Sequence, residues 1–488
     1  AIRDASITYA HEPKGDRYAF TDANLSLGRI SQDGDAIPID GGLAFDVQPA
    51  GYTGTIELDT SVSFDSETGA VTFGESSLKG VVEGIAAEPT QLSFGTAGIA
   101  VDTAAKTTTV QPLELSVLGV DISAETEPFS YADAITPVAA IRVDAFSPRA
   151  LMQMLGVAAP ETADPSALTS VMLSATANVG ENAVRLTGLS IRLDDTSFTG
   201  SMTVPFASSG RFFARLDGDA IDLNRYMAPA GDEGAADAGE TPPLEIPAEL
   251  LEPLNVKGEL TLDRVLLGAL QLDDVSVTID AANGRTRIYP ISAQLFGGGY
   301  EGDIRIDVSG SVPSLNVNET VQGIDLARLA KAMFDQDNIT GSLAGSFRLG
   351  GRGHNMAEVQ QTLAGTMSFE LRDGTYEGTD LWYELRRARA ALKKETPPEP
   401  VLPARTRFTT LTASGVVKDG VMRNDDLAAE LPFMRLSGSG NVNIPMGTVD
   451  YSVKARVLEK PEAMAGATPE EIDDFTKTVI PLKITGPL

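Results

Sequence analysis

The sequence predicts a mainly β protein, a meander of antiparallel strands with a few short helices. Branched or large apolar residues alternate with Thr, Ser, Asp and Arg along most of the chain. This period of two is typical of half-buried strands. Turn sequences separate the runs, since Gly, Asn and Asp adopt the backbone angles of hairpin turns at little cost. The predicted turns are Asp33-Gly34, Glu67-Thr68-Gly69, Asn283-Gly284, Asp373-Gly374 and Asp419-Gly420.

The alternation also indicates which residues share one face of the sheet. Successive side chains of a strand point to opposite faces, so apolar residues two positions apart lie on the same side. The same residues would fill the core of a closed sandwich equally well, and the alternation alone leaves both arrangements open. The candidate binding residues are Leu113, Leu115, Val117, Leu189, Ile191, Leu193, Val275, Val277, Ile279, Ile304, Ile306, Val308, Val453 and Val457.

Three short helices are predicted, each after an extended run that ends in a capping residue. They follow Ser147, Asp222 and Asp325, whose side chains can accept hydrogen bonds from first-turn N–H groups. Their spacing indicates a repeat of strands plus one short helix at roughly 75 to 80 residues. Chance similarity among separate sandwich domains is the alternative.

Two further helices are expected near the C-terminal end. The first covers residues 379–394 and carries an apolar stripe. The second begins with a capping box that has Pro at its first position. The stripe consists of Leu381, Leu385, Ala388 and Leu392, and the capping box is Thr468-Pro469-Glu470-Glu471. The stripe predicts that the first of these helices packs across a groove end or covers a sheet.

The composition excludes several classes of protein. The 488 residues include no cysteine, so disulfide scaffolds, thiol catalysis and Cys-ligated metal sites are impossible. With 38 basic and 68 acidic residues the formal charge is −30, which disfavours nucleic-acid binding because phosphates are neutralised by clustered Lys and Arg. The sequence contains no run of about eighteen apolar residues, so it predicts no membrane-spanning helix. The strand-like ends suggest a segment trimmed from a longer protein.

A search for catalytic and cofactor motifs yields weak candidates. Residues 297–302 fit a dinucleotide fingerprint, but a strand follows them where that motif requires a helix. His11 and His354 are far apart in sequence and are expected in surface loops. Acidic pairs such as Asp194-Asp195, and the partial calcium-loop pattern at Asp335, are expected to be solvated turn residues. We therefore expect a protein that is not an enzyme and that uses no metal or cofactor.

A spaced series of short motifs occupies about the last quarter of the chain. In these motifs the sequence resembles the C-terminal region of the AsmA family of Gram-negative envelope proteins, and a weaker similarity covers most of the preceding chain. The motifs are GTYEGTDL at 374–381, TRFTTLTAS at 406–414, Gly420-Val421, Asp425-Asp426-Leu427, RLSGSG at 435–440 and Asp450-Tyr451-Ser452-Val453.

The resemblance implies a mainly β, elongated, curled antiparallel sheet of repeated β units. This sheet forms an open hydrophobic groove of the repeating-β type, related to chorein-type lipid bridges. The resemblance also implies phospholipid transport or homeostasis between inner and outer membranes, with indirect effects on outer-membrane assembly, and no catalytic residues. The implied location is the periplasm, with attachment to the inner membrane through an N-terminal anchor that is absent from this chain. The implied partners are phospholipid acyl chains and outer-membrane components.

On this basis four parts are expected. They are N-terminal groove repeats at 1–227, an acidic Ala/Gly/Pro loop at 228–247, middle groove repeats at 248–373 and the AsmA-like region at 374–488. Two other functions are compatible with the residues. One is a periplasmic assembly factor that binds outer-membrane strands along a sheet edge, and the other is an adhesive protein of stacked sandwiches.

Overall fold

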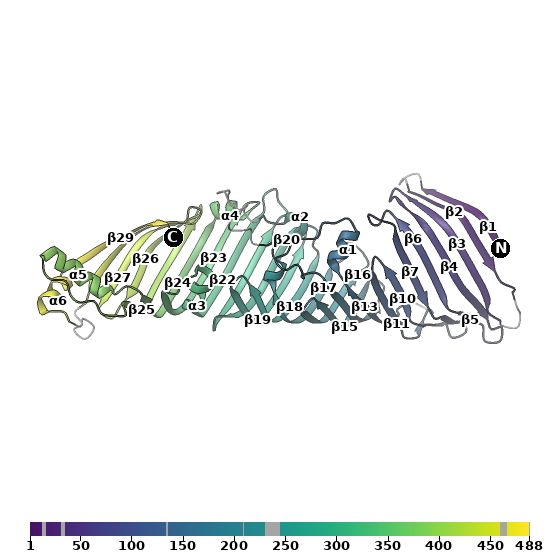
Figure 1. The fold of residues 1–488 in the computed structure, drawn as a ribbon, viewed down its shortest axis with the longest axis horizontal. Helices are drawn as coiled ribbons and strands as arrows, with labels where there is room; N and C mark the ends of the chain where they lie inside the picture. The colour runs from purple at the N-terminus through teal and green to yellow at the C-terminus, as the bar shows by residue number, and fades with distance from the viewer. Residues whose placement is uncertain are drawn as a thin grey trace. The chain divides into compact units, whose positions relative to one another are not determined.

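The computed structural model describes residues 1–11, 16–30, 35–132, 135–207, 209–229, 245–458 and 466–487. The chain forms two compact units, Ala1–Glu233 and Gly234–Leu488, and both consist mainly of strands (Figure 1). The boundary between them falls inside the segment 228–247, most of which lies outside the described residues. No helix among the described residues is long and apolar enough to cross a membrane.

The first unit is an antiparallel meander with two short helices. Its helices are α1 (Pro148–Met154) and the 3-10 helix η1 (Leu223–Tyr226). Its strands are β1 (Ile2–His11), β2 (Asp16–Leu27), β3 (Ile37–Gln48), β4 (Tyr52–Phe64), β5 (Ala70–Phe73), β6 (Ser76–Glu83), β7 (Thr90–Thr96), β8 (Ile99–Asp102), β9 (Thr107–Val110), β10 (Leu113–Val117), β11 (Val120–Thr126), β12 (Phe129–Ser130), β13 (Val138–Phe146), β14 (Val171–Val179), β15 (Ala183–Leu193), β16 (Thr196–Pro205) and β17 (Phe212–Asp222).

The strands from β5 to β12 are short and form four end-to-end pairs: β5 with β6, β7 with β8, β9 with β10, and β11 with β12. The break within each pair divides the sheet locally into two ladders. One ladder continues from β4 through β6, β7, β10 and β11, and the other from β4 through β5, β8, β9 and β12. Threonine hydroxyls bind polar groups at the interruptions. Thr96 Oγ1 donates to the carbonyl of Gln111 at 3.2 Å, and Thr126 Oγ1 donates to that of Val110 at 3.2 Å. The interruptions therefore do not leave these two backbone carbonyls unpaired.

The second unit is an uninterrupted antiparallel meander in which each strand pairs with the next one in sequence. Its helices are α2 (Ala248–Leu251), α3 (Leu326–Phe334), α4 (Met356–Gln361), α5 (Leu381–Lys393) and α6 (Pro469–Thr476). Its strands are β18 (Val256–Leu267), β19 (Leu270–Ala282), β20 (Arg285–Leu295), β21 (Gly298–Asp307), β22 (Ser314–Asp325), β23 (Ile339–Arg352), β24 (Ala364–Glu377), β25 (Arg405–Lys418), β26 (Val421–Glu430), β27 (Met434–Asn443), β28 (Thr448–Val457) and β29 (Val479–Pro487).

The predicted fold class is confirmed, since each unit is an open antiparallel sheet with few short helices. All three short helices start at their predicted caps: Ser147, Asp222 and Asp325 accept hydrogen bonds from the N–H groups of Ala150, Asn224 and Arg328. The capping box of α6 is also confirmed, with both of its reciprocal hydrogen bonds present.

Most of the predicted turns are confirmed, and one is wrong. The pairs Asn283-Gly284 and Asp419-Gly420 have positive φ and join neighbouring strands. Asp373-Gly374 instead lies inside β24, where Asp373 has a φ of 50°. A Cβ on Gly374 would lie 2.0 Å from Phe408 Cζ. The glycine at this site therefore makes room for a cross-strand aromatic ring and does not reverse the chain. The pair Asp33-Gly34 lies outside the described residues.

The apolar stripe predicted for α5 is wrong in part. Leu385 is buried, but Leu392 is 87% exposed at the last turn. The face of α5 that packs on the protein contains Trp382, Leu385 and Arg389, which are spaced by three and four positions. The helix is therefore rotated relative to the leucine stripe, and it places an arginine in its packed face.

Candidate binding groove

Cross-strand registers in the second unit align apolar residues into continuous rows on one sheet face, which we call the apolar face. One row crosses strands β18 to β25, and a second continues from β25 to β29. The first row is Leu260, Val277, Ile291, Gly302, Glu319, Phe347, Met367 and Gly415. The second is Val417, Met422, Val442, Val449 and Gly486. Together the two rows carry the apolar face from β18 to β29.

The structure places the predicted residues of the second unit on this apolar face. Val275, Val277 and Ile279 alternate along β19, and Ile304 pairs with Ile288 of β20. The other members follow the same alternation. They are Ile306 on β21, Val308 directly after it, and Val453 and Val457 on β28.

In the first unit the predicted residues also share one face. A register row joins β10 to β15 through three intervening strands. The row is Leu115, Ile122, Val143, Leu173 and Ile191. Leu113 and Val117 flank Leu115 on β10, and Leu189 and Leu193 flank Ile191 on β15. Within each unit, the alternation therefore identifies residues that share one face.

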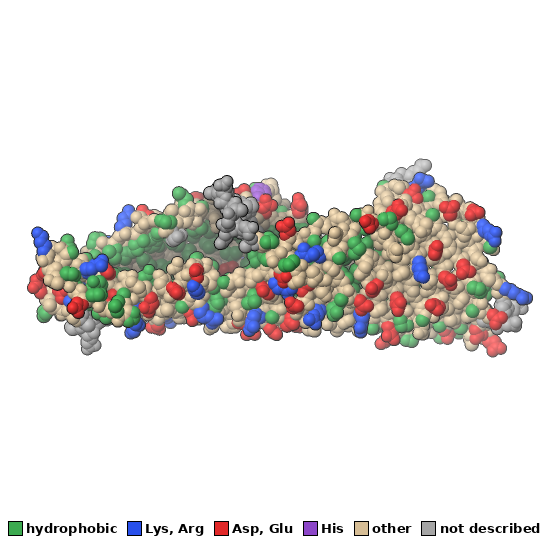
Figure 2. Space-filling view, viewed as in Figure 1, with side chains coloured by type: hydrophobic (Ala, Val, Ile, Leu, Met, Phe, Trp, Pro, Cys, Tyr) green, Lys and Arg blue, Asp and Glu red, His purple; other side chains and the backbone are tan. Residues whose placement is uncertain are grey.

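The apolar face of the second unit is only partly covered over its middle strands. Ile288, Ile304, Phe347 and Met367 are all half-buried, whereas residues of a sandwich core are fully buried. The strands of each unit belong to one sheet, so the described residues provide no second sheet to close a sandwich. Figure 2 shows a hollow lined by hydrophobic side chains over the C-terminal strands of this unit. This hollow is the candidate binding groove.

One polar pair interrupts the apolar face. Glu319 on β22 is the one charged residue in the first row, between Gly302 and Phe347. A Cβ on Gly302 would lie 2.8 Å from Tyr300 Oη, so the tyrosine hydroxyl lies over the glycine. Burial, together with the charge and hydrogen bond of Glu319, raises the pKa of Tyr300. Sequence reasoning missed this pair, although Glu319 stands where the alternation of β22 requires an apolar residue.

The groove is closed by helices at its C-terminal end. Trp382 of α5 and Phe475 of α6 pack against each other with ring centroids 5.4 Å apart, and the Trp382 ring also contacts Phe433 at 5.2 Å. These side chains form a core with Met434 and Val457, which are 0% and 2% exposed. Val457 therefore belongs to a closed core, unlike the half-buried Val277 on the same face.

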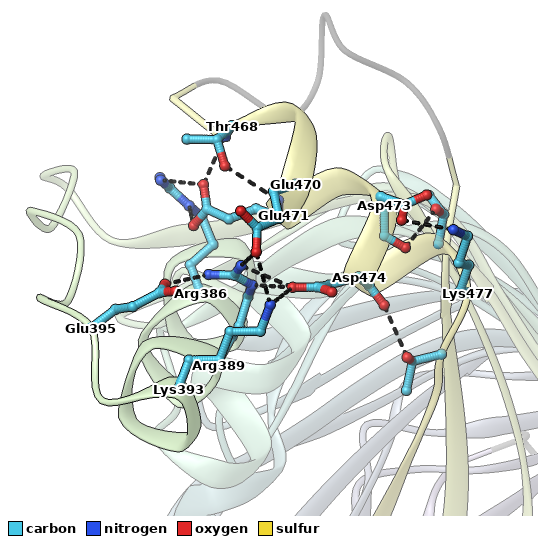
Figure 3. Close-up of polar contacts among 12 residues, drawn as sticks. Arg386, Arg389, Lys393, Glu395, Thr468, Glu470, Glu471, Asp473, Asp474 and Lys477 are labelled. Carbon is cyan, nitrogen blue, oxygen red and sulfur yellow. Dashed lines mark hydrogen bonds and ion pairs between the residues drawn. The ribbon is translucent and has the colours of Figure 1, made fainter.

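Ion pairs hold α5 and α6 together above this core (Figure 3). Arg386 Nε lies 3.2 Å from Glu471 Oε1, and Arg389 Nη2 lies 2.8 Å from Asp474 Oδ2. Lys393 also pairs with Asp474, and both cations hold the pKa of that carboxyl below its ordinary value. Burial alone would raise the pKa of Glu471, but the Thr468 N–H and Arg386 lower it further than burial raises it. The charged network therefore fixes the helical cover of the groove end.

The weak chemical candidates have structural explanations. The glycines from 297 belong to a tight turn and the first residues of β21, and His354 contacts Glu358 Oε2 at 3.3 Å on the surface. The expectation that Asp194 is solvated is wrong: its side chain is buried, because it accepts hydrogen bonds from the N–H groups of Leu168, Thr169 and Ser170. Asp335 caps α3 and pairs with Lys331 at 2.5 Å. No group of three or more potential metal ligands occurs among the described residues. The side chain of His11 lies outside them.

Comparison with known proteins agrees with this architecture. Residues 2–427 match the model of the AsmA family. The chain is also 22% identical over 318 residues to Protein AsmA of Escherichia coli (strain K12). That alignment covers 61% of this chain and 50% of the relative, so the chain spans about half the length of the curated relative.

Proposed function

Because the chain belongs to the AsmA family, which is associated with the Gram-negative envelope, we propose that its apolar face binds phospholipid acyl chains. In this proposal the protein takes part in phospholipid transport and homeostasis between the inner and outer membranes and influences outer-membrane assembly indirectly. Its role is binding and guidance, without catalysis. The location proposed is the periplasm, with attachment to the inner membrane.

The half-buried state of the apolar side chains in the first row is the observation that carries the proposal. Burial of one methylene contributes about 0.8 kcal/mol, so release of an acyl chain of about 16 carbons into water costs on the order of 12 kcal/mol. A carrier therefore has to keep the chain covered throughout its movement. Twelve strands spaced about 4.8 Å apart give the apolar face of the second unit a length of roughly 50 Å. This length supports guided movement of a lipid along the sheet.

A second candidate function uses the edge of the sheet. Strand β29 pairs with β28 and with no other strand among the described residues. Its Val479 and Ile484 are 52% and 54% exposed. An unpaired edge can accept an extended peptide as an additional strand. This observation favours an assembly factor that binds outer-membrane protein strands.

Native mass spectrometry of gently purified protein distinguishes the two functions. The lipid proposal predicts co-purified phospholipid that is displaced when the apolar face is made polar. The edge proposal predicts binding of a synthetic outer-membrane strand peptide, no bound lipid, and loss of the peptide when Pro replaces Thr485 on β29. Absence of phospholipid under conditions in which the protein remains folded would reject the lipid proposal.

A further inference from the structure

The sheet face opposite the apolar face gathers arginines over strands β20 to β23. The chain as a whole has a formal charge of −30. On this outer face, however, along Asp303–Asp307 of β21 and the positions of β20, β22 and β23 paired with it, five arginines face two aspartates; Glu301 lies two positions before Asp303. The arginines are Arg285, Arg287, Arg305, Arg348 and Arg352. The local charge is therefore opposite in sign to that of the whole chain.

Three of these arginines surround a shallow depression. Arg348 and Arg352 lie on β23, two residues before and two residues after Gly350, so all three positions share one face. The register places Gly350 opposite Asn316 and Asn316 opposite Arg305. Gly350 has no side chain, and the side-chain oxygen of Asn316 lies over it, 2.4 Å from where a Cβ would be. Ser314, Asn318 and Thr366 also line the depression.

The one carboxylate of the depression is already neutralised. Asp303 accepts from Arg287 Nε at 3.0 Å and Nη2 at 2.8 Å, and from Arg305 Nε at 3.2 Å and Nη2 at 2.7 Å. Its side chain is 7% exposed, whereas that of Arg305 is 59% exposed. Arg348 and Arg352 form no ion pair with any residue that the structure describes. Two exposed guanidiniums therefore remain without a carboxylate partner.

We propose that this depression binds an oxyanion of the phosphate class, either as free phosphate or as the headgroup of an anionic lipid. Guanidinium groups bind phosphate through paired N–H donors in a fixed planar geometry. The amides of Asn316 and Asn318 and the hydroxyl of Thr366 supply additional donors. The site lies on the face opposite the groove, so it does not depend on acyl-chain binding.

Calorimetric titration of the full chain with sodium phosphate at constant ionic strength tests the site. The double variant Arg348→Gln/Arg352→Gln is expected to bind phosphate at least about tenfold more weakly. Arg423→Gln is the matched control, because Arg423 is an exposed outer-face arginine that pairs with Asp425. Its affinity is expected to equal that of the wild type. An equal loss of phosphate affinity in the control and in the double variant would overturn the proposal.

Flotation with phosphatidylcholine vesicles, with and without phosphatidylglycerol, identifies the source of the phosphate. Flotation that requires phosphatidylglycerol and is lost in the double variant supports a lipid headgroup. Phosphate binding that the double variant loses, without flotation, supports a soluble phosphate. No phosphate binding and no flotation would reject the site. If the Gln variant does not fold, Arg348→Lys/Arg352→Lys is used in its place. It is expected to bind phosphate more weakly than the wild type, because an ammonium group lacks the paired N–H donors of a guanidinium. Unchanged phosphate affinity in the Lys variant would contradict the proposal.

Discussion

The substitution Val277→Asp separates an open apolar face from a closed core. Val277 is half-buried between Leu260 and Ile291, so an aspartate there retains contact with water. Loss of part of the valine burial and partial desolvation of the carboxylate are expected to destabilise the fold by about 1–2 kcal/mol. An acyl chain that avoids the charge exposes three or four methylenes, which weakens lipid binding by about 2–3 kcal/mol, or roughly 30- to 150-fold.

Two matched variants make the comparison quantitative. Val457→Asp places the same charge in the closed core, where the native side chain is 2% exposed, and is expected to destabilise by roughly 4 kcal/mol or more. Ser276→Asp places the charge on the opposite face of β19, beside Thr261 and Ser292. This variant is expected to change neither the stability of the fold nor the amount of bound phospholipid. Chemical denaturation measures stability, and native mass spectrometry measures bound phospholipid. Destabilisation of Val277→Asp equal to that of Val457→Asp would refute an open face, and so would unchanged lipid content.

Three further predictions concern the packing of the second unit. Gly374→Ala is expected to lower the free energy of unfolding by about 2–3 kcal/mol, because the added Cβ would lie 2.0 Å from Phe408 Cζ; chemical denaturation measures this loss. Arg389→Ala removes a 9%-exposed arginine between α5 and α6 and is expected to cost about 2–3 kcal/mol, with faster hydrogen exchange over residues 469–476. Asp303→Asn is expected to destabilise by about 1–2 kcal/mol at pH 7. That difference should disappear toward low pH, because Arg287 first and then Arg305 lower the pKa of Asp303 to about 2; the stabilisation is complete above the unfolded-state pKa near 4 and is lost as the pH falls through about 2.

Two of these predictions have a matched control variant, and the third has an outcome that would contradict it. Gly299→Ala should be tolerated, because nothing lies within 4 Å of the added Cβ. Arg387→Ala should change stability by less than about 0.5 kcal/mol, since Arg387 is 58% exposed and pairs only along its own helix with Glu384. A destabilisation by Asp303→Asn that stays constant from pH 7 to pH 2 would contradict the assigned ion pairs.

The sequence was most informative where local chemistry determines structure. Ser147, Asp222 and Asp325 identified three helix starts correctly, because a capping side chain acts within a few residues. Period-two alternation identified residues that share a face within each unit, since the pleat fixes that relation locally. These signals required no knowledge of which strands pair.

Long-range packing was beyond the reach of the sequence. The leucine stripe failed to orient α5 because aromatic contacts with Phe433 and ion pairs with α6 determine which face is packed. Asp373-Gly374 has the composition of a turn, yet Phe408 from a neighbouring strand determines its role. The difference between the half-buried Val277 and the buried Val457 depends on helices that lie far from Val277 in the sequence.

Accessibility of single cysteines on the apolar face tests the central claim most directly, because the natural chain contains no cysteine. Cysteine replaces Val277, Ile304 or, as a buried control, Val457, and the rate of modification by a polar maleimide is measured with and without phospholipid. We expect cysteines at 277 and 304 to react in the lipid-free protein and to be protected by phospholipid, while the cysteine at 457 reacts in neither state. Cysteines at 277 and 304 that are as unreactive as the one at 457, with or without lipid, would contradict an open lipid-binding face.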